Sequence, residues 1–220
     1  MTERDEVLGE VAARLVAAAP GHPLRVAIDG ICGAGKTTFA VDLADRLRRL
    51  GRPVIHVDSD GFHAVRAIRY RQGRDSARGY YEDAYDLDAV RALVLAPLGP
   101  GGSHRYAEHV HDLETDEVAP RFATAPADAI VLFAATFVQR VALRDCWDEV
   151  IWLEVPPAVA EERGVARDAA ALGGETAARE AHAMRYSAAC AIYVAEEQPG
   201  ERASIVVEHT DPARPTITRS

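Results

Sequence analysis

The segment "LRVAIDGICGAGKTTFA", residues 24–40, decides the fold class of this chain. Residues 24–29 form a short apolar run with Val and Ile, which predicts a buried strand. Residues 30–37, "GICGAGKT", fit the pattern G-x-x-x-x-G-K-[ST], and residues 36–50 then place apolar side chains at helical spacing up to Gly51. A strand, a glycine-rich turn and a helix in this order predict a loop that wraps phosphate groups.

The residues of this loop have distinct expected roles. Glycines let the backbone approach closely, so that its N–H groups point at phosphate oxygens. Lys36 is expected to reach the β- and γ-phosphates of a nucleotide, and Thr37 to offer its hydroxyl to Mg²⁺. Lys36 is the single lysine among 25 Lys and Arg residues, so a local requirement must keep it a lysine. The candidate nucleotide-binding residues are Gly30, Gly33, Ala34, Gly35, Lys36, Thr37 and Thr38.

The composition bounds the class of protein. The chain has 220 residues, of which 27% are charged and 48% hydrophobic, as in an ordinary globular protein. A net charge of −9 argues against nucleic acid or an anionic membrane as the main partner. No apolar run reaches the roughly 20 residues that span a bilayer, and the acidic, amphipathic N-terminal segment is unlike a signal peptide. Three widely spaced cysteines show no metal-binding pattern, so we expect reduced thiols and a cytoplasmic location.

Strands and helices are expected to alternate along the rest of the chain. This alternation predicts a parallel sheet with helices on both faces. We therefore expect a single domain over residues 1–220, with a three-layer α/β fold and a five-stranded parallel sheet. The expected helices are residues 3–18, 86–98, 157–171 and 174–192, the expected strands 53–58, 128–134, 149–155 and 203–209, and a small hairpin is expected at 103–117.

Two carboxylates follow the second expected strand, in "DSDGFH", residues 58–63. In a parallel sheet this places Asp58 and Asp60 at the carboxyl edge, beside the phosphate loop. A carboxylate there can accept the proton of an attacking hydroxyl, although a solvated acidic turn is the alternative. A GTPase is excluded, because its base-reading N-K-x-D motif needs a second lysine.

The motifs "VAIDGICGAGKTTFA", "DGFH", "GYYEDAYD" and "RGVARD" together resemble the uridine kinase-like branch of P-loop kinases. This branch includes uridine–cytidine kinase, phosphoribulokinase and bacterial pantothenate kinase, and the resemblance covers residues 24–212. It implies phosphorylation of a hydroxyl on a small metabolite with ATP and Mg²⁺. It also implies that Asp60 is the base and that Asp58 binds the metal through water.

The resemblance further implies a helical lid near residues 160–190. Its arginines, Arg163 and Arg167, lie four apart on one helix face and would neutralise charge on the transferred phosphoryl group. Glycines within residues 171–176 could act as its hinge. The alternative is an ordinary helix face on which the arginines pair with Glu161, Glu162 and Asp168.

The acceptor pocket is less clearly marked. Tyr106 and His111 have the spacing of a Tyr and a His that contact the pyrimidine in uridine–cytidine kinases, although an ordinary hairpin pair is the alternative. The ribose-binding Asp of those enzymes falls at Tyr80, for which Asp83 is a candidate substitute. Residues 63–80 carry five Arg and one Asp, which could hold an anionic acceptor, cover the ATP site or form a solvated helix face. The candidate acceptor-binding residues are Phe62, His63, Arg66, Tyr80, Asp83, Tyr106 and His111.

One feature departs from the resemblance, in "AIVLFAATFV", residues 129–138. The equivalent strand usually ends in an Asp or Glu near Mg²⁺, and here it ends in Ala134 and Ala135. Mg²⁺ could be held by Thr37, phosphates, water and the acids of residues 58–60; turnover could be slow or lost; or the small side chains could make room for a bulky acceptor. We favour an active kinase with a nucleoside as the first guess for its acceptor. An ATP-binding protein without kinase activity and an antibiotic-modifying phosphotransferase remain alternatives.

Overall fold

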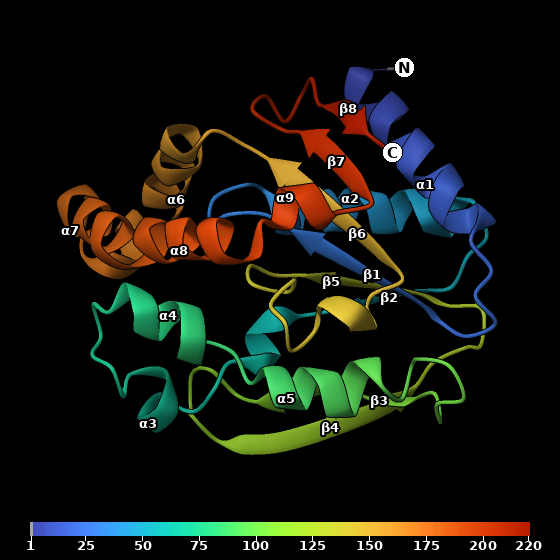
Figure 1. The fold of residues 1–220 in the computed structure, drawn as a ribbon, viewed down its shortest axis with the longest axis horizontal. Helices are drawn as coiled ribbons and strands as arrows, with labels where there is room; N and C mark the ends of the chain where they lie inside the picture. The colour runs from blue at the N-terminus through green and yellow to red at the C-terminus, as the bar shows by residue number, and fades with distance from the viewer. Residues whose placement is uncertain (1) are drawn as a thin grey trace.

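The computed structural model describes residues 2–220 and contains a six-stranded sheet and a separate two-stranded hairpin (Figure 1). The strands are β1 (Leu24–Asp29), β2 (Val54–Val57), β3 (Arg105–His111), β4 (Val118–Thr124), β5 (Ile130–Ala134), β6 (Glu149–Glu154), β7 (Ile205–Glu208) and β8 (Thr216–Arg219). The α-helices are α1 (Glu3–Ala17), α2 (Lys36–Arg49), α3 (Arg66–Arg69), α4 (Ala77–Asp83), α5 (Leu87–Val90), α6 (Pro157–Leu172), α7 (Glu175–Ala181), α8 (Ser187–Glu197) and α9 (Pro199–Arg202). Further helical turns, of 3₁₀ or π type, are η1 (Ser59–Phe62), η2 (Arg91–Leu95), η3 (Arg144–Cys146) and η4 (His182–Tyr186).

The strand order of the sheet is β2-β5-β1-β6-β7-β8. The first five strands run parallel, which confirms the α/β fold class expected from the alternating elements. The expected number of strands was wrong, because β8 adds a sixth, antiparallel to β7. β8 is a short, mostly exposed edge strand that follows a proline-rich turn, and its sequence lacks the apolar run from which the other five strands were predicted.

The hairpin is longer than the expected 103–117. That range holds β3 and the turn, whereas the second strand, β4, begins only at Val118. β4 contains Pro120, which is uncommon inside a strand, and it is largely exposed, so its sequence does not mark it as a strand. In Figure 1 the hairpin lies with α5 on the side of the sheet opposite α1 and α2.

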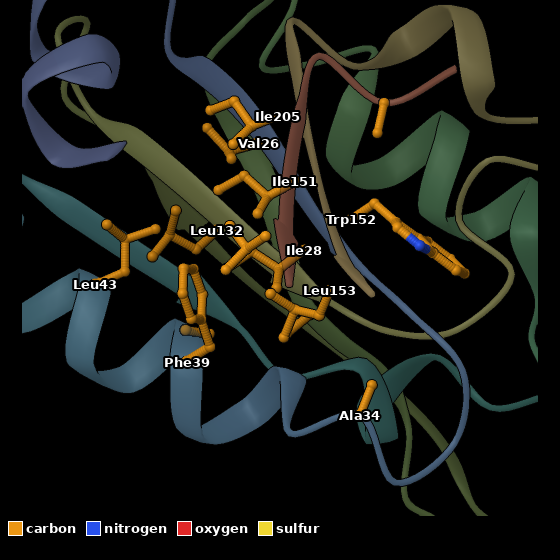
Figure 2. Packing of buried hydrophobic residues seen from close by; sticks show 14 of the residues in the cluster. Val26, Ile28, Ala34, Phe39, Leu43, Leu132, Ile151, Trp152, Leu153 and Ile205 are labelled. Carbon is orange, nitrogen blue, oxygen red and sulfur yellow. The ribbon is translucent and has the colours of Figure 1, made fainter. Parts of the chain in front are cut away.

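Alternation along the strands produces three layers. Val26 and Ile28 of β1 belong to one buried core, formed with the inner faces of α1 and α2. Ala27 belongs to a second core, which the α5–η2 segment and the hairpin cover. Figure 2 shows Phe39 and Leu43 of α2 lying against the strand residues of the first core. Because side chains of a strand alternate between faces, the apolar run of β1 predicts burial on both sides.

Two expected helices contain an irregular turn. The predicted helix at 86–98 is α5 followed by the π-helical turn η2, and the predicted helix at 174–192 is α7, the π-helical turn η4 and α8. No helix within residues 2–220 is long and apolar enough to cross a membrane.

A buried carboxylate joins α8 to the sheet. Asp29, the last residue of β1, accepts hydrogen bonds from Tyr193 Oη (2.5 Å to Oδ2), Gln139 Nε2 (2.9 Å to Oδ2) and Gly30 N–H (2.8 Å to Oδ1). Gln139 N–H in turn donates to Tyr193 Oη at 3.0 Å. These bonds connect β1, the segment after β5 and α8. Burial nevertheless raises the pKa of Asp29 to about 6, because it disfavours the charged form.

This raised pKa sets a pH dependence of stability. Between the ordinary pKa of 3.8 and about 6, folded Asp29 holds a proton that the unfolded chain has lost, so its contribution to stability falls as pH rises. In Asp29→Asn, which stays neutral, this loss is absent. We expect the free energy of unfolding of the wild type, relative to Asp29→Asn, to drop by up to about 3 kcal/mol between pH 4 and pH 7. Urea denaturation of both proteins across this range measures it, and a constant difference would contradict the burial argument.

Candidate functional site

The glycine-rich loop lies between β1 and α2, as its sequence predicts. Gly33 and Gly35 adopt φ angles of 83° and 90°, in the left-handed region that favours glycine. Gly35 is the N-cap of α2, whose 14 residues direct their first free N–H groups toward the loop. A Cβ at Gly33 would lie 1.9 Å from the carbonyl oxygen of Ala160 in α6, so α6 packs directly on the loop. The arrangement suits an anion.

Lys36 folds back over the loop. Its Nζ donates hydrogen bonds to the carbonyl oxygens of Gly30 and Ile31, both at 2.9 Å. Thr37 and Thr38 lie exposed in the first turn of α2. A cleft of about 390 Å³ at this position is lined by Gly33, Gly35, Lys36, Thr37, Thr38, Arg163, Arg167, His209 and Pro212.

His209 forms a hydrogen bond to the backbone of the phosphate loop, a role that was not predicted from the sequence. Its ring is buried, lies edge-on to Phe39 at 5.8 Å and donates from Nδ1 to the carbonyl oxygen of Ala34 at 2.9 Å. Burial lowers the pKa of His209, so the ring is neutral at physiological pH. A single His after the strand "SIVVE" gives no sequence signal for this role.

The two acids after β2 occupy different positions. Asp58 Oδ1 caps the turn η1 by accepting a hydrogen bond from Asp60 N–H at 3.0 Å. Asp60 leaves 67% of its side chain exposed, with Oδ1 3.5 Å from His63 Nε2. His63 in turn donates from Nδ1 to the carbonyl oxygen of Ala84 at 2.8 Å, and its ring stacks on Tyr85 at 4.4 Å. These contacts fix the imidazole beside the carboxylate.

The charge state of Asp60 follows from its neighbours. The contact with His63 lowers the pKa of Asp60 below its ordinary value, and the charge of Arg167 adds to this effect. Asp60 is therefore ionised at neutral pH and able to accept a proton.

Asp60 lines a second cleft, which has a volume of about 640 Å³. Arg167 lines this cleft as well as the one at the phosphate loop, so the two clefts adjoin. Among the predicted site residues, the second cleft therefore brings together Asp60, His63, Arg66, Tyr80 and Arg167.

The two lid arginines have separate partners in α6 and beyond. Arg163 donates to the carbonyl oxygens of His209 (3.2 Å) and Thr210, which ties α6 to the segment after β7. Arg167 forms a two-pronged ion pair with Asp168, at 2.7 and 2.8 Å, which raises the pKa of the guanidinium. Arg167 therefore has the ion-pair partner on its own helix that the alternative expects, and it also lines the cleft at the phosphate loop.

Four predicted acceptor residues lie elsewhere. Phe62 and Tyr106 are buried in the core beneath the hairpin. Asp83 is buried and accepts hydrogen bonds from Arg71 and Gln72, while His111 Nε2 lies 2.9 Å from Asp116 Oδ1. Asp83 and His111 line a further pocket of about 570 Å³, which shares His63 with the cleft at Asp60. Each of these polar side chains already has a protein partner.

The donor set fits a metal that is bound mainly through phosphates and water. Within residues 2–220, no group of three or more His, Cys, Asp or Glu side chains is arranged to hold a metal ion. The carboxyl end of β5, between β1 and β2, carries the buried Ala134 and Ala135. Thr37 lines the cleft at the phosphate loop and Asp60 the adjoining cleft, whereas Asp58 lines neither and uses Oδ1 to cap η1. Mg²⁺ keeps several waters and needs few protein ligands, so this set suits Mg²⁺.

Comparison with solved structures finds proteins whose fold is similar to that of this chain. No protein-family model matches the chain. No curated protein matches it in sequence. Among solved structures, it is similar to a possible uridine kinase from Bacillus stearothermophilus, with 23% identity, 92% of this chain and 97% of that chain covered, and a TM-score of 0.72. A putative fructose transport system kinase from a Silicibacter species has 24% identity, coverage of 89% and 95%, and a TM-score of 0.68. A D-glycerate 3-kinase from Cryptococcus neoformans has 15% identity, coverage of 86% and 87%, and a TM-score of 0.56.

The contact between the loop and α6 can be tested with two matched glycines. Gly33→Ala should cost about 2–4 kcal/mol, because the new Cβ adds a clash with Ala160 to the strain at φ 83°. Gly51 has φ 81° and open space around it, so Gly51→Ala should cost only about 1–2 kcal/mol. Gly33→Ala should also weaken nucleotide binding, whereas Gly51→Ala should not. Chemical denaturation and ADP titration measure both effects, and equal behaviour of the two variants would contradict the packing.

Proposed function

We propose that this chain transfers the γ-phosphoryl group of ATP to a hydroxyl of a small metabolite. The observation that carries the proposal is the shared wall between the two clefts. Arg167 lines both the cleft at the phosphate loop and the cleft that contains Asp60. A phosphate donor and a hydroxyl acceptor would therefore meet beside one arginine and one ionised carboxylate. The fold supports the proposal, because the similar structures are described as kinases.

The donor side would bind the nucleotide phosphates. The free N–H groups at the start of α2 and the ammonium of Lys36 present positive charge to the phosphate oxygens. Thr37 and Asp58 are the residues that would hold Mg²⁺, which neutralises phosphate charge when bound. Lys36 already points into the loop, so its role requires a change of hydrogen-bond partners rather than of backbone.

The acceptor side would carry out the proton transfer. The acceptor oxygen attacks the γ-phosphorus and forms a new O–P bond. The bond from this phosphorus to the β,γ-bridging oxygen breaks, and its electron pair leaves on ADP. Asp60 accepts the proton of the hydroxyl and later releases it to water. Arg163 and Arg167 would stabilise the charge on the transferred group.

A second candidate function is nucleotide binding without turnover. The observation that favours it is the pair of buried alanines at the end of β5, where the kinases that this sequence resembles carry an acid. Both candidates require Lys36, whereas only phosphoryl transfer requires Asp60.

The experiment that tests the proposal measures ADP formation from ATP and Mg²⁺ with a panel of acceptors. The panel contains nucleosides, vitamins, sugars, sugar phosphates and hydroxy acids. We expect acceptor-dependent ADP formation by the wild type and its loss in Lys36→Ala, which removes a charge from the phosphate loop while leaving the fold intact. ATP binding without ADP formation from any acceptor would favour the second candidate. Unchanged ATP affinity in Lys36→Ala would contradict both.

The roles of the two acids can be separated. Asp60→Asn keeps the shape of the side chain but removes its basicity, so turnover should fall by about 10²–10⁴-fold with ATP affinity preserved. Asp58→Asn keeps an oxygen that can accept the Asp60 N–H bond, and should mainly raise the Mg²⁺ concentration needed for half-maximal turnover. Steady-state kinetics with varied Mg²⁺ compare the variants. The reverse pattern would exchange the assignments of base and metal partner.

A further inference from the structure

The cleft at Asp60 is lined by an excess of positive charge. Five arginines face it, and the acids among its lining residues are Asp60 and Asp168. Asp168 is already bound to Arg167 and lies 2.9 Å from His182 Nε2. In Figure 1, the segments that supply these arginines, α3, the α3–α4 connection, α6 and η4, gather at one side of the molecule. The lining arginines are Arg66, Arg69, Arg74, Arg167 and Arg185.

Two of these arginines are buried without a carboxylate. Arg69 is 6% exposed and Arg185 is 8% exposed, and neither forms an ion pair with any residue from 2 to 220. Arg69 donates to the carbonyl oxygen of Ala64 at 3.3 Å, and Arg185 to that of Arg74. The Nε atoms of Arg69 and Arg185 are buried and lack a hydrogen-bond partner within the described chain. Burying a cation whose N–H donors lack acceptors costs free energy unless an anion accepts hydrogen bonds from them.

Another buried arginine shows what a completed site looks like in this chain. Arg25 is also 8% exposed. Its Nε and Nη2 donate hydrogen bonds to the carboxylate of Asp148, at 2.9 and 2.8 Å. This bidentate pairing is the geometry that guanidinium groups form with carboxylate or phosphate. The contrast indicates that Arg69 and Arg185 are arranged for an oxyanion that the chain itself does not supply.

Aromatic rings compensate only part of this charge. The guanidinium carbons of Arg69, Arg74 and Arg185 lie 5.0, 4.5 and 5.0 Å from the centre of the Tyr70 ring. Arg185 also lies 5.0 Å from the Tyr80 ring centre. Each contact is favourable, but three cations around one ring repel each other. The rings hold the guanidinium groups in place, and an anion between them would remove the repulsion.

We infer that the acceptor carries, in addition to its reacting hydroxyl, a phosphate or carboxylate group that Arg69 and Arg185 bind, with Arg74 at the exposed rim of the site. This inference rests on the proposed function, since it assigns the acceptor cleft to a class of substrate. Asp60 would face the hydroxyl at one side of the cleft, while the arginines hold the anionic end at the other. The inference replaces the neutral nucleoside guessed from the sequence, whose base and ribose offer no oxyanion to these residues.

Binding of matched ligands tests the inference directly. Ribose 5-phosphate, ribonate and ribose share a five-carbon skeleton but carry a phosphate, a carboxylate and no charge. They are titrated calorimetrically into the full chain with saturating ADP and Mg²⁺, so that the phosphate loop is filled. We expect one or both anions to bind at least about 10-fold more tightly than ribose, and the stronger of the two identifies the oxyanion. Equal affinity for all three, or no binding of either anion, overturns the inference.

Variants locate the binding to the two buried arginines. Arg69→Gln and Arg185→Gln should each weaken binding of the anion by about 10–100-fold and leave the affinity for ribose unchanged. Each change removes an uncompensated buried charge, so we expect melting temperatures at or above that of the wild type. The two residues lie in different elements, so one variant remains informative if the other fails to fold. Arg78→Gln, outside the cleft and paired with Glu196, should bind like the wild type. Wild-type affinity in both Arg69→Gln and Arg185→Gln overturns the inference.

Turnover separates this inference from the proposed function. ADP formation with an anionic acceptor, lost in Arg69→Gln, supports both. ADP formation with neutral acceptors alone keeps the proposed function and overturns the inference. Anion binding as described, without ADP formation from any acceptor, overturns the proposed function and supports an oxyanion site formed by the same arginines.

Discussion

The buried carboxylate of Asp29 is the point on which the site depends. It ends β1, precedes the phosphate loop and accepts the hydroxyl of Tyr193 from α8. Gln139, just after β5, donates to the same carboxylate. Burial of this group is costly, and its hydrogen bonds offset that cost only when all three segments are in place. The network therefore couples the position of the loop to that of α8, which leads from η4 and its Arg185.

The parts of the fold that sequence could predict are those with a local signal. Consecutive residues mark β1, the phosphate loop and α2, which together give the strand, glycine-rich turn and helix of the motif. The other four parallel strands are apolar runs of the expected length. β8 and β4 have no such signal, because both are exposed and one contains Pro120. His209 and Asp29 act through partners more than 100 residues away in sequence, so no local pattern identifies them.

The cleft at Asp60 shows a different limit of sequence reasoning. Arg66 and Arg74 are visible as part of a basic stretch, but the burial that distinguishes Arg69 from its neighbours depends on tertiary packing. Arg185 comes from a segment about 110 residues away and joins Arg69 at the ring of Tyr70. The spacing of Tyr106 and His111, by contrast, selected a core residue and a partner of Asp116. Spacing in the sequence identifies residues on the same helix or strand, whereas a binding site is formed by residues that lie close together in the folded chain.

The two alanines at the end of β5 are consistent with the positive charge of the arginines in the cleft at Asp60. Ala134 and Ala135 are buried, and the next residue, Thr136, lies 3.9 Å from Cys32 of the phosphate loop rather than at a cluster of acids. An acid there would add negative charge near a cleft whose arginines are arranged to attract an anion. The whole chain carries a net charge of −9, so an anionic acceptor gains little from the protein as a whole and depends on the local field of this cleft. In the proposed reaction, fewer carboxylates beside Mg²⁺ and more arginines at the acceptor would therefore have the same electrostatic effect, which is to lower the repulsion between two anionic substrates.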